Sequence, residues 1–441
     1  MVKLAHVFNR MQQKRVLVAG DFMVDHYTFG KSKRISPEAP VPVILVDREE
    51  DRAGGAGNVV LNLISLGMEV TALGMVGDDD AGRVLIDCLA KESVETKALY
   101  CQKGFHTPKK SRIIASNQQI VRIDYERVEA LEEKLECKII SEIEALVSTQ
   151  DVVAISDYAK GFLTEKILHE IIRAAKKHNV PVIADPKGTE FAKYAHATIL
   201  KPNLSEALAA ANLPGKPLSE VAREIFKKVD VDVLMITRSE AGISLYYPDG
   251  TSEDHPVVQA KEIRDVTGAG DTVLAVLASA IANGLSLSDA TSLSNIAATV
   301  AVERVGCARV TLPEIARRLI DLHSGGKIFE NAHFSVLEHA LKGKEFIELQ
   351  LESGCEVNAQ LLRAVRELAH NKTRELVVSI ADPSADEEVV SVLASLKDVD
   401  YIHLGQSSTG DSCSPTFKQA LKANQVFEFK GSTLKECLNR S

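Results

Sequence analysis

The sequence predicts an α/β protein built on a mostly parallel β-sheet, followed by a second and smaller α/β domain. Two observations lead to this prediction. Short aliphatic runs alternate with amphipathic stretches along the chain, which is the pattern of repeated βαβ units. The aliphatic runs at 152–156 and 233–237 do not alternate polar and apolar residues, so we expect helices to cover both faces of the sheet.

The first domain is predicted to contain most of the sheet. Its expected strands are residues 15–19, 70–75, 152–156, 181–184, 198–200 and 233–237. Its expected helices are residues 58–66, 82–91, 164–178, 218–229, 269–283, 288–305 and 313–322. Two segments, about 29–47 and 107–126, lack helical periodicity, and the second alternates polar and apolar residues. We expect these two segments to add exposed antiparallel strands to the main sheet as a lid.

A short polar and glycine-rich break, H-S-G-G-K at 323–327, is the predicted domain boundary. It separates a first domain of residues 1–323 from a second of residues 327–441. In the second domain we expect helices at 336–341, 358–370 and 386–396, and strands at 346–351, 376–380 and 401–404. About a hundred residues are enough for this domain to hold its own core.

Composition excludes several classes of protein. The chain has 441 residues, 45% of them apolar, and a formal charge of -9, so neither a disordered chain nor a nucleic-acid binder is expected. No apolar run approaches the ~20 residues of a membrane span. Charges interrupt the N-terminal segment, which does not resemble a signal peptide. Seven scattered cysteines without a C-x-x-C pair favour a reducing compartment. We therefore expect a soluble, cytoplasmic protein with no membrane or nucleic-acid partner.

The segment D-V-T-G-A-G-D at 265–271 leads directly into an apolar helix. Small residues before a helix leave backbone N–H groups free to face an anion, so we expect one beside Gly268, Ala269 and Gly270. Asp271, in the first turn, would lie next to that anion and could accept a proton from an attacking hydroxyl. An ordinary capped helix is the alternative. The sequence contains no Walker A motif.

A second glycine cluster, A-G-G-A-G-N at 53–58, opens another predicted helix. It does not match the dinucleotide-binding pattern G-x-G-x-x-G. Gly55 and Asn58 would suit close approach of the backbone to a polyhydroxylated ligand. A structural glycine turn is the alternative.

Acidic residues stand at the ends of three predicted strands: Asp21, Asp157 and Asp185. Ligands of open parallel sheets bind beyond the carboxyl ends of the strands, so we expect these acids to meet at one edge. Lys160 and Lys187 follow two of them closely. Carboxylates and cations together suit a substrate with both hydroxyls and a phosphate, although each lysine singly could be a solvated loop charge.

Seven motifs in order resemble a known family. V-T-G-A-G-D at 266–271 and N-L-S-E at 203–206 resemble the ribokinase-type (PfkB) sugar kinases. Further segments narrow the resemblance to the kinase half of the bifunctional heptose enzymes of lipopolysaccharide core synthesis, and they lie at 20–25, 34–42, 156–161, 184–188 and 237–240. The resemblance covers about residues 10–320. It implies a ribokinase-like sandwich with a β lid, and a homodimer formed through the lid strands.

The resemblance implies transfer of the ATP γ-phosphate to the anomeric hydroxyl of D-glycero-β-D-manno-heptose 7-phosphate, on the route to ADP-heptose. Asp271 would be the base, and the amides of Gly268, Ala269 and Gly270 the anion hole. Mg²⁺ would be held through waters by Asn203 and Glu206. The nucleotide would be contacted by Asn203, Thr237, Gly242 and Asn295. The sugar would be contacted by Asp21, Asp25, Gly55, Asn58 and Asp157, and its phosphate by Arg34, Lys110, Arg112, Lys160 and Lys187.

The resemblance weakens in the second domain. In the bifunctional relatives this domain is a Rossmann-like nucleotidyltransferase with a G-x-F-D strand end and an H-x-G-H loop. Here the chain reads K-I-F-E-N-A-H at 327–333, with His333 and His339 but no H-x-G-H and no glycine between 330 and 342. The resemblance therefore implies a degenerate, inactive transferase.

Three alternatives stay open. The substrate could be another sugar phosphate, such as a hexose phosphate. The chain could be a pseudokinase with a role in assembly, although Asp271, Asn203 and Glu206 are all intact. The second domain could still transfer nucleotides with a changed motif, or it could be an independent binding domain.

Overall fold

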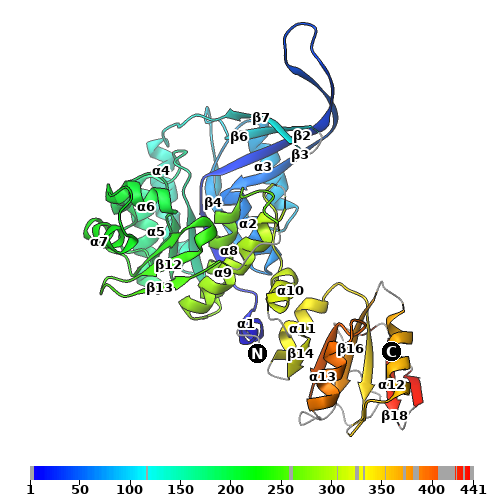
Figure 1. Ribbon diagram of the computed structural model, residues 1–441. Helices are drawn as coiled ribbons and strands as arrows, with labels where there is room; N and C mark the ends of the chain where they lie inside the picture. The colour runs from blue at the N-terminus through cyan, green and yellow to red at the C-terminus, as the bar shows by residue number, and fades with distance from the viewer. Residues whose placement is uncertain are drawn as a thin grey trace. The chain divides into compact units, whose positions relative to one another are not determined.

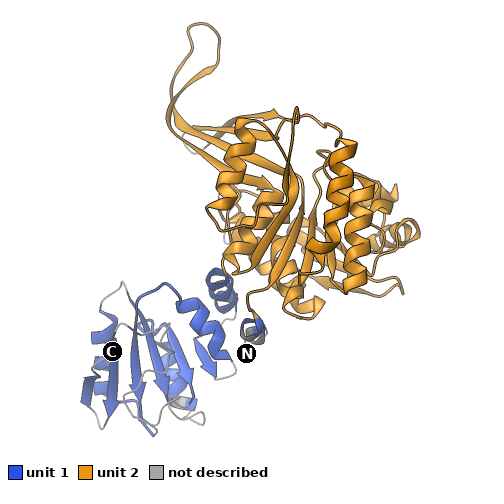
Figure 2. Ribbon diagram, turned by 180° about the vertical axis from the view of Figure 1, so that it is seen from behind, with its two compact units in different colours: residues 1–10, 312–441 blue, residues 11–311 orange. Residues whose placement is uncertain are grey.

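The structure is a computed structural model of the chain. It describes residues 4–115, 118–257, 262–304, 306–322, 327–330, 333–352, 354–370, 374–380, 387–405, 423, 425–430 and 433–437. The chain divides into two compact units, one of residues 11–311 and one of residues 1–10 with 312–441 (Figure 2). The boundary predicted at 323–327 stays a prediction, because residues 323–326 lie outside the described residues.

No helix within the described ranges combines the length and the apolar character that a membrane crossing requires.

The larger unit is built on a nine-stranded sheet with the strand order β13-β12-β11-β10-β9-β8-β1-β4-β5 (Figure 1). Its strands are β1 (Arg15–Gly20), β4 (Glu69–Gly77), β5 (Leu99–Gln102), β8 (Val152–Ser156), β9 (Val182–Asp185), β10 (Ile199–Leu200), β11 (Val233–Thr237), β12 (Ile243–Tyr246) and β13 (Ser252–His255). All neighbours pair in parallel except β11 with β12 and β12 with β13. The predicted parallel sheet is confirmed.

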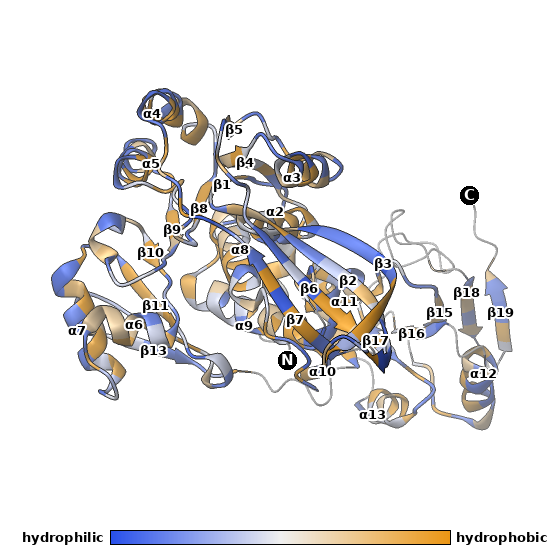
Figure 3. Cartoon of the chain, turned by 90° about the horizontal axis from the view of Figure 1, so that it is seen from above, coloured by the Kyte–Doolittle hydropathy of each residue, from blue (hydrophilic) through white to orange (hydrophobic). Residues whose placement is uncertain are grey.

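Helices cover both faces of this sheet. They are α2 (Ala56–Ser65), α3 (Asp80–Ala90), α4 (Glu133–Val147), α5 (Glu165–His178), α6 (Leu204–Ala211), α7 (Leu218–Lys228), α8 (Ala269–Ala282) and α9 (Leu287–Val302). One face packs on α4, α5 and α7, and the other contacts α2 and α8. The central strands are apolar, whereas the helices carry both hydrophobic and hydrophilic residues (Figure 3).

The lid forms its own four-stranded sheet. Its strands are β2 (Phe22–Ile35), β3 (Pro42–Gly55), β6 (Lys109–Ala115) and β7 (Gln118–Tyr125), in the order β3-β2-β6-β7. The prediction that these strands extend the main sheet is wrong. Both neighbours of β1 are taken, by β4 and β8, so the strand that follows β1 has no place beside it. The central pair, β2 with β6, is also parallel rather than antiparallel. The β2–β3 hairpin projects away from the body of this unit (Figure 1).

The smaller unit contains a six-stranded sheet in the order β14-β17-β16-β15-β18-β19, parallel except for β19. Its strands are β14 (Ile328–Glu330), β15 (Phe346–Leu351), β16 (Glu375–Ile380), β17 (Tyr401–Leu404), β18 (Gln425–Lys430) and β19 (Thr433–Cys437). Its helices are α1 (Ala5–Arg10), α10 (Leu312–Leu322), α11 (Phe334–Leu341), α12 (Ala359–Ala369) and α13 (Glu387–Ser395). The helices and strands predicted for the second domain are confirmed, and β14, β18 and β19 were not predicted.

Candidate active site

The candidate site lies at the carboxyl ends of strands β8 to β11, on one side of the point at β1 where the strand order reverses. From β1 the chain continues to β4 on one side, while β8 on the other side leads on to β9. Because the connections after β1 and β8 run in opposite directions, the loops that follow these two strands diverge and open a crevice. Open α/β sheets bind ligands in such a crevice. A cleft of about 180 Å³ lies at this edge. It is lined by Asp157, Tyr158, Asp185, Pro186, Lys187, Lys201, Asn203, Glu206, Thr237, Gly268, Gly270 and Asp271.

The N-terminus of α8 forms one wall of the cleft. Gly268 precedes the helix with φ +78°, a left-handed conformation that favours glycine. A Cβ at Gly268 would come within 2.7 Å of the side-chain nitrogen of Asn58. A Cβ at Gly270 would meet no heavy atom within 4 Å, so space is open beside this part of the backbone. The predicted anion site therefore borders open space at a helix N-terminus.

Asp271 is buried and held from two sides. The Asn58 side-chain amide donates to its Oδ2 at 2.8 Å, and the Tyr158 hydroxyl donates to its Oδ1 at 2.7 Å. Burial raises the pKa of Asp271 to about 6, while the two hydrogen bonds lower it. The group is therefore ionised at neutral pH but basic enough to take a proton.

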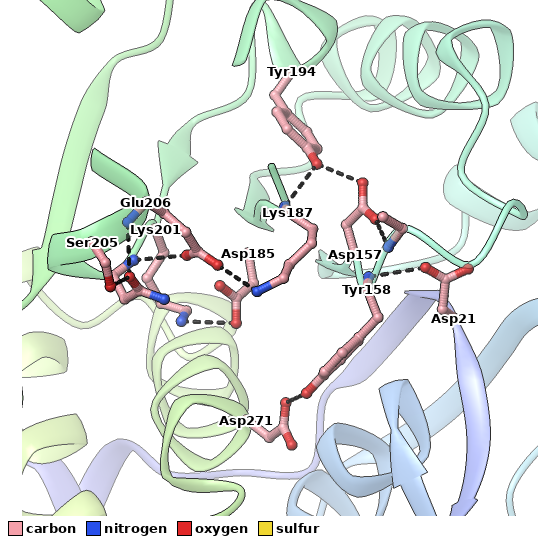
Figure 4. A network of polar contacts seen from close by, with 12 residues as sticks. Asp21, Asp157, Tyr158, Asp185, Lys187, Tyr194, Lys201, Ser205, Glu206 and Asp271 are labelled. Carbon is pink, nitrogen blue, oxygen red and sulfur yellow. Dashed lines mark hydrogen bonds and ion pairs between the residues drawn. The ribbon is translucent and has the colours of Figure 1, made fainter. Parts of the chain in front are cut away.

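The loop after β8 is anchored by Asp21. Its carboxylate accepts hydrogen bonds from the backbone N–H groups of Tyr158, Lys160 and Phe162, at 2.9, 3.0 and 3.4 Å. Asp21 is buried, and this burial raises its pKa to about 6. The convergence of Asp21 and Asp157 at one edge is as predicted. The structure adds a function for Asp21 that the sequence did not indicate, since it orders the loop that carries Tyr158 (Figure 4).

Asp157 is fixed by the turn that follows β9. Its Oδ2 accepts from the Lys193 ammonium at 2.7 Å and from the Tyr194 hydroxyl at 2.5 Å. Its Oδ1 accepts from the backbone N–H of Ala159 at 2.7 Å. Asp157 thus faces the cleft in a fixed orientation.

Two ion pairs cross the cleft wall (Figure 4). The Lys201 ammonium lies 2.9 Å from Asp185 Oδ2, and the Lys201 side chain is 2% exposed. Burial raises the pKa of Asp185, and the charge of Lys201 opposes that rise. The Lys187 ammonium lies 2.8 Å from Glu206 Oε1, at the more exposed end of the cleft.

Asn203 and Glu206 form a capping box at the start of α6. The Asn203 side chain accepts from the backbone N–H of Glu206 at 2.9 Å, and Glu206 Oε2 accepts from the backbone N–H of Asn203 at 3.1 Å. Within the described part of the chain, no group of three His, Cys, Asp or Glu side chains is arranged to hold a metal.

The other predicted residues lie at various distances from this cleft. Thr237 lines the cleft. Gly242 and Asn295 instead lie next to the backbone of His255. A Cβ at Gly242 would collide with the His255 carbonyl oxygen, and the Asn295 side-chain amide donates to that same oxygen. Lys160 pairs with Glu126 at 2.9 Å.

Five predicted residues belong to the lid strands. Asp25 and Arg112 form a buried ion pair there, with the Cys307 thiol 3.6 Å from Asp25. Lys110 lies beside Asp25 in the next strand. Arg34 lies nine residues beyond Asp25 on β2, roughly 30 Å along an extended strand, so one copy of the chain does not bring these two together. Gly55 has φ +56° and precedes α2, which carries Asn58.

Sequence reasoning missed Tyr158 and Lys201, which line the cleft, and Tyr194, which holds Asp157. Lys201 directly follows a predicted strand and Tyr158 lies two residues after one, and a polar residue at that place is a usable signal. Tyr194 offered no such signal, because it lies in a short turn after the sheet edge.

Comparisons with known proteins agree with this geometry. The model of the pfkB family carbohydrate kinases matches residues 13–315. A bifunctional protein HldE from Trichlorobacter lovleyi is 45% identical over 312 residues, which cover 70% of this chain and 63% of the relative. Another, from Pelobacter propionicus, is 38% identical over 421 residues, which cover 91% of this chain and 86% of the relative. Thus this chain spans only part of the length of the relatives it matches.

Two solved structures share the fold. The ribokinase of Arabidopsis thaliana, in complex with ribose and ATP, aligns with a TM-score of 0.54 at 19% identity, over 70% of this chain and 99% of its own. The tetrameric inhibited form of phosphofructokinase-2 from Escherichia coli aligns with a TM-score of 0.57 at 19% identity, over 70% of this chain and 99% of its own.

Proposed function

The chain belongs to the pfkB family of carbohydrate kinases, and we propose that it transfers the γ-phosphate of ATP to the anomeric hydroxyl of D-glycero-β-D-manno-heptose 7-phosphate. The observation that supports phosphoryl transfer most directly is Asp271. It is a buried carboxylate at a helix N-terminus, and the neighbouring backbone at Gly270 borders open space. The heptose substrate is supported by the bifunctional HldE relatives.

In the proposed reaction Asp271 accepts the proton of the sugar hydroxyl as its oxygen bonds to the γ-phosphorus. The bond between this phosphorus and the β–γ bridging oxygen breaks, and ADP leaves. The N-terminus of α8 would stabilise the negative charge on the transferred group. Asn58 and Tyr158 fix the orientation of Asp271, so that little reorganisation is needed.

The cleft offers enough protein oxygens for a magnesium ion, which needs only one or two of them. Mg²⁺ keeps several waters and takes one or two protein oxygens together with phosphates. Glu206 and Asn203 supply such oxygens at the cleft edge, and we propose that they hold the ion through waters. Bound there, it would neutralise charge on the nucleotide phosphates. Thr237 would contact the nucleotide at the same edge.

The second unit is proposed to be catalytically silent. His339 Nδ1 lies 2.8 Å from the Ser335 carbonyl oxygen within α11, and its ring packs against Phe8. His333 precedes that helix. Neither histidine lies in an H-x-G-H loop, and no glycine stands near the start of α11 to admit a phosphate.

We also propose a homodimer formed through the lid. Large apolar side chains are exposed on its strands, among them Leu45, Val46, Val121, Ile123 and Tyr125. Val121, Ile123 and Tyr125 alternate along β7 and so share one side of the sheet, and an exposed apolar face of this kind is typical of a protein interface. A single-chain mass in sedimentation equilibrium at micromolar concentration would contradict the homodimer.

A single assay tests both halves of the proposal. The 441-residue chain is incubated with ATP and heptose 7-phosphate while ADP is measured, and with heptose 1-phosphate and ATP or CTP while pyrophosphate is measured. We expect ADP and no pyrophosphate. Pyrophosphate would mean that the second unit still transfers nucleotides. ADP only with another sugar phosphate would keep the kinase but overturn the heptose substrate.

The pH dependence of kcat/KM tests the role of Asp271. Its pKa is about 6 in the free protein and it must be ionised to accept a proton, so kcat/KM should rise with pH through about 6. Tyr158→Phe removes a hydrogen bond that stabilises the ionised form, so the midpoint should move to higher pH. Tyr100→Phe is the matched control, because this hydroxyl donates to Glu142 on α4, outside the cleft. An unshifted profile in Tyr158→Phe would contradict the positioning of Asp271 by Tyr158.

A further inference from the structure

Helix α2, which packs against α8, carries two polar side chains in an otherwise apolar buried surface. Among its buried residues, only Asn58 and Asn62 have polar side chains. The two lie four residues apart, so they stand on the same side of the helix. Asparagine is a weak helix former, and burial of an amide is costly unless the amide is hydrogen-bonded. Both amides should therefore have partners that recover this cost.

A chain of hydrogen bonds joins the two amides to Asp271. The backbone N–H of Val310 donates to Asn62 Oδ1 at 3.2 Å. Asn62 Nδ2 donates to two oxygens of Asn58, the carbonyl oxygen at 2.9 Å and Oδ1 at 3.3 Å. Asn58 Nδ2 donates in turn to Asp271 Oδ2 at 2.8 Å. All four residues are buried, so water competes little for these hydrogen bonds.

The two ends of this chain fix the direction of every hydrogen bond in it. A backbone N–H can only donate, so the Asn62 atom that faces Val310 is the oxygen. The nitrogen of Asn62 then faces Asn58, and the Asn58 atoms that accept from it are both oxygens. The nitrogen of the Asn58 amide is left for Asp271. An ionised carboxylate can only accept, so the other end of the chain demands the same direction.

Asn62 decides which end of the Asn58 amide faces the base. The last torsion of an asparagine side chain is broad and roughly two-fold, so without Asn62 the Asn58 amide could turn through 180°. Its oxygen would then face Asp271, where it could accept from a protonated carboxyl. With Asn62 in place the nitrogen faces the base, and a donor at this position favours the ionised form.

We propose that Asn62 is a positioning residue, which holds the Asn58 amide with its nitrogen toward Asp271 and so keeps the base ready to accept the hydroxyl proton. Asn62 does not line the cleft, so it acts through Asn58. This inference rests on the proposed function, because it assumes that Asp271 is the base. It accounts for two buried amides in the interior of α2.

The other groups around Asp271 stay in place when Asn62 is changed. Besides Asn58, these groups are the Tyr158 hydroxyl, the Asp185 carboxylate, the Lys201 ammonium and the buried Cys307 thiol. Within the described chain, the Asn62 side chain bonds to Asn58 and to the Val310 backbone, and to none of these four groups. A change in the pKa of Asp271 on substitution of Asn62 therefore passes through Asn58.

The test replaces Asn62 by serine and follows kcat/KM against pH. A serine hydroxyl in a helix can donate to the carbonyl oxygen four residues earlier, and its single hydrogen then leaves none for Asn58 Oδ1. In Asn62→Ser the midpoint of the profile should rise by about one pH unit, the size expected for one hydrogen bond. Above about pH 8 the variant should approach the wild-type value, because an ionised carboxylate attracts the amide nitrogen by itself.

Asn283→Ser is the matched control. Like Asn62, Asn283 is a buried asparagine that donates to the carbonyl oxygen four residues earlier, that of Ser279, at 2.9 Å. Its Oδ1 also accepts from a backbone N–H, that of Gln12, at 2.9 Å. Asn283 follows the last residue of α8, about 18 Å along the helix axis from Asp271. This variant loses equivalent hydrogen bonds, and its midpoint should stay at the wild-type pH.

A double-mutant cycle tests whether Asn62 acts through Asn58. Asn58→Leu removes the amide that Asn62 orients, so Asn62→Ser in that background should move the midpoint no further. An equal shift with and without Asn58 would overturn the inference. So would an unshifted midpoint in Asn62→Ser, or a fall in kcat/KM by the same factor at every pH. An unfolded Asn62→Ser beside a folded Asn283→Ser would make Asn62 a structural residue and would also overturn it.

The carboxyl carbon-13 shift of Asp271, assigned by comparison with Asp271→Asn, follows the same protonation without any substrate. We expect its midpoint to rise in Asn62→Ser and to stay unchanged in Asn283→Ser. This titration separates the inference from the proposed function. If wild type releases no ADP with any sugar phosphate, the proposed function fails, and the carbon-13 midpoints still decide whether Asn62 controls the protonation of Asp271.

Discussion

Asp271→Asn is expected to lower kcat by roughly 10²–10⁴-fold, the range for loss of a positioned general base. The fold should survive the change. The Asn oxygen can still accept from Asn58, and its amide can donate to the Tyr158 hydroxyl, which also accepts hydrogen bonds. The dissociation constant for ATP should therefore stay within a few-fold of the wild-type value.

Single-turnover kinetics with ATP and heptose 7-phosphate measure this effect, and calorimetry with a non-hydrolysable ATP analogue measures nucleotide binding. Asp249→Asn is the control, because this exposed carboxylate lies in the turn before β13 and bonds only to Thr251 among the described residues. Full activity of Asp271→Asn would remove Asp271 as the base. If nucleotide affinity fell by the same factor as kcat, the Asp271 carboxylate would be needed for the structure of the site rather than for proton transfer.

Lys201→Met is expected to lower the free energy of unfolding by about 3 kcal/mol, the lower end of the range for breaking a buried ion pair. It removes the ammonium that pairs with Asp185 and leaves a partly buried carboxylate without its partner. Adding Asp185→Asn removes the unpaired charge, so the double variant should recover most of the lost stability. Urea unfolding of the wild type and of both variants measures these differences.

Activity of the double variant decides what Lys201 does in the cleft. Its ammonium lies among residues that border both Asp271 and Glu206, a place where it can contact nucleotide phosphates. We expect kcat/KM for ATP to stay at least tenfold below wild type even when stability is restored. Full recovery of kcat/KM would limit Lys201 to a structural role.

The main elements were predictable because local sequence determines them. The strands at 15–20, 152–156 and 233–237 are apolar runs buried on both faces, and each was predicted within a residue. The helix α4 was missed, although Ile139, Ile143 and Val147 recur every fourth residue and are its buried apolar positions. The many charged residues between these apolar positions made the helical pattern hard to recognise in the sequence.

The lid shows where local reasoning fails. Its segments were correctly predicted to be extended, but their pairing was not. Whether a strand joins the main sheet depends on which edges are free, and β1 offers none because β4 and β8 flank it. Tyr27 on β2 and Arg52 on β3, whose guanidinium lies over the Tyr27 ring, become neighbours only through that pairing.

The sequence by itself determined the fold class of the larger unit, its likeness to sugar kinases, and the identity of Asp271 as the candidate base. These follow from periodicity and from short motifs, whose residues are close in the chain. Only the tertiary structure decided what holds Asp271: Asn58 is 213 residues away and Tyr158 is 113. It also decided that Asp21 orders a loop and that Lys201 pairs with Asp185. Burial and hydrogen bonding between distant segments arise from packing, and no local pattern of residues encodes them.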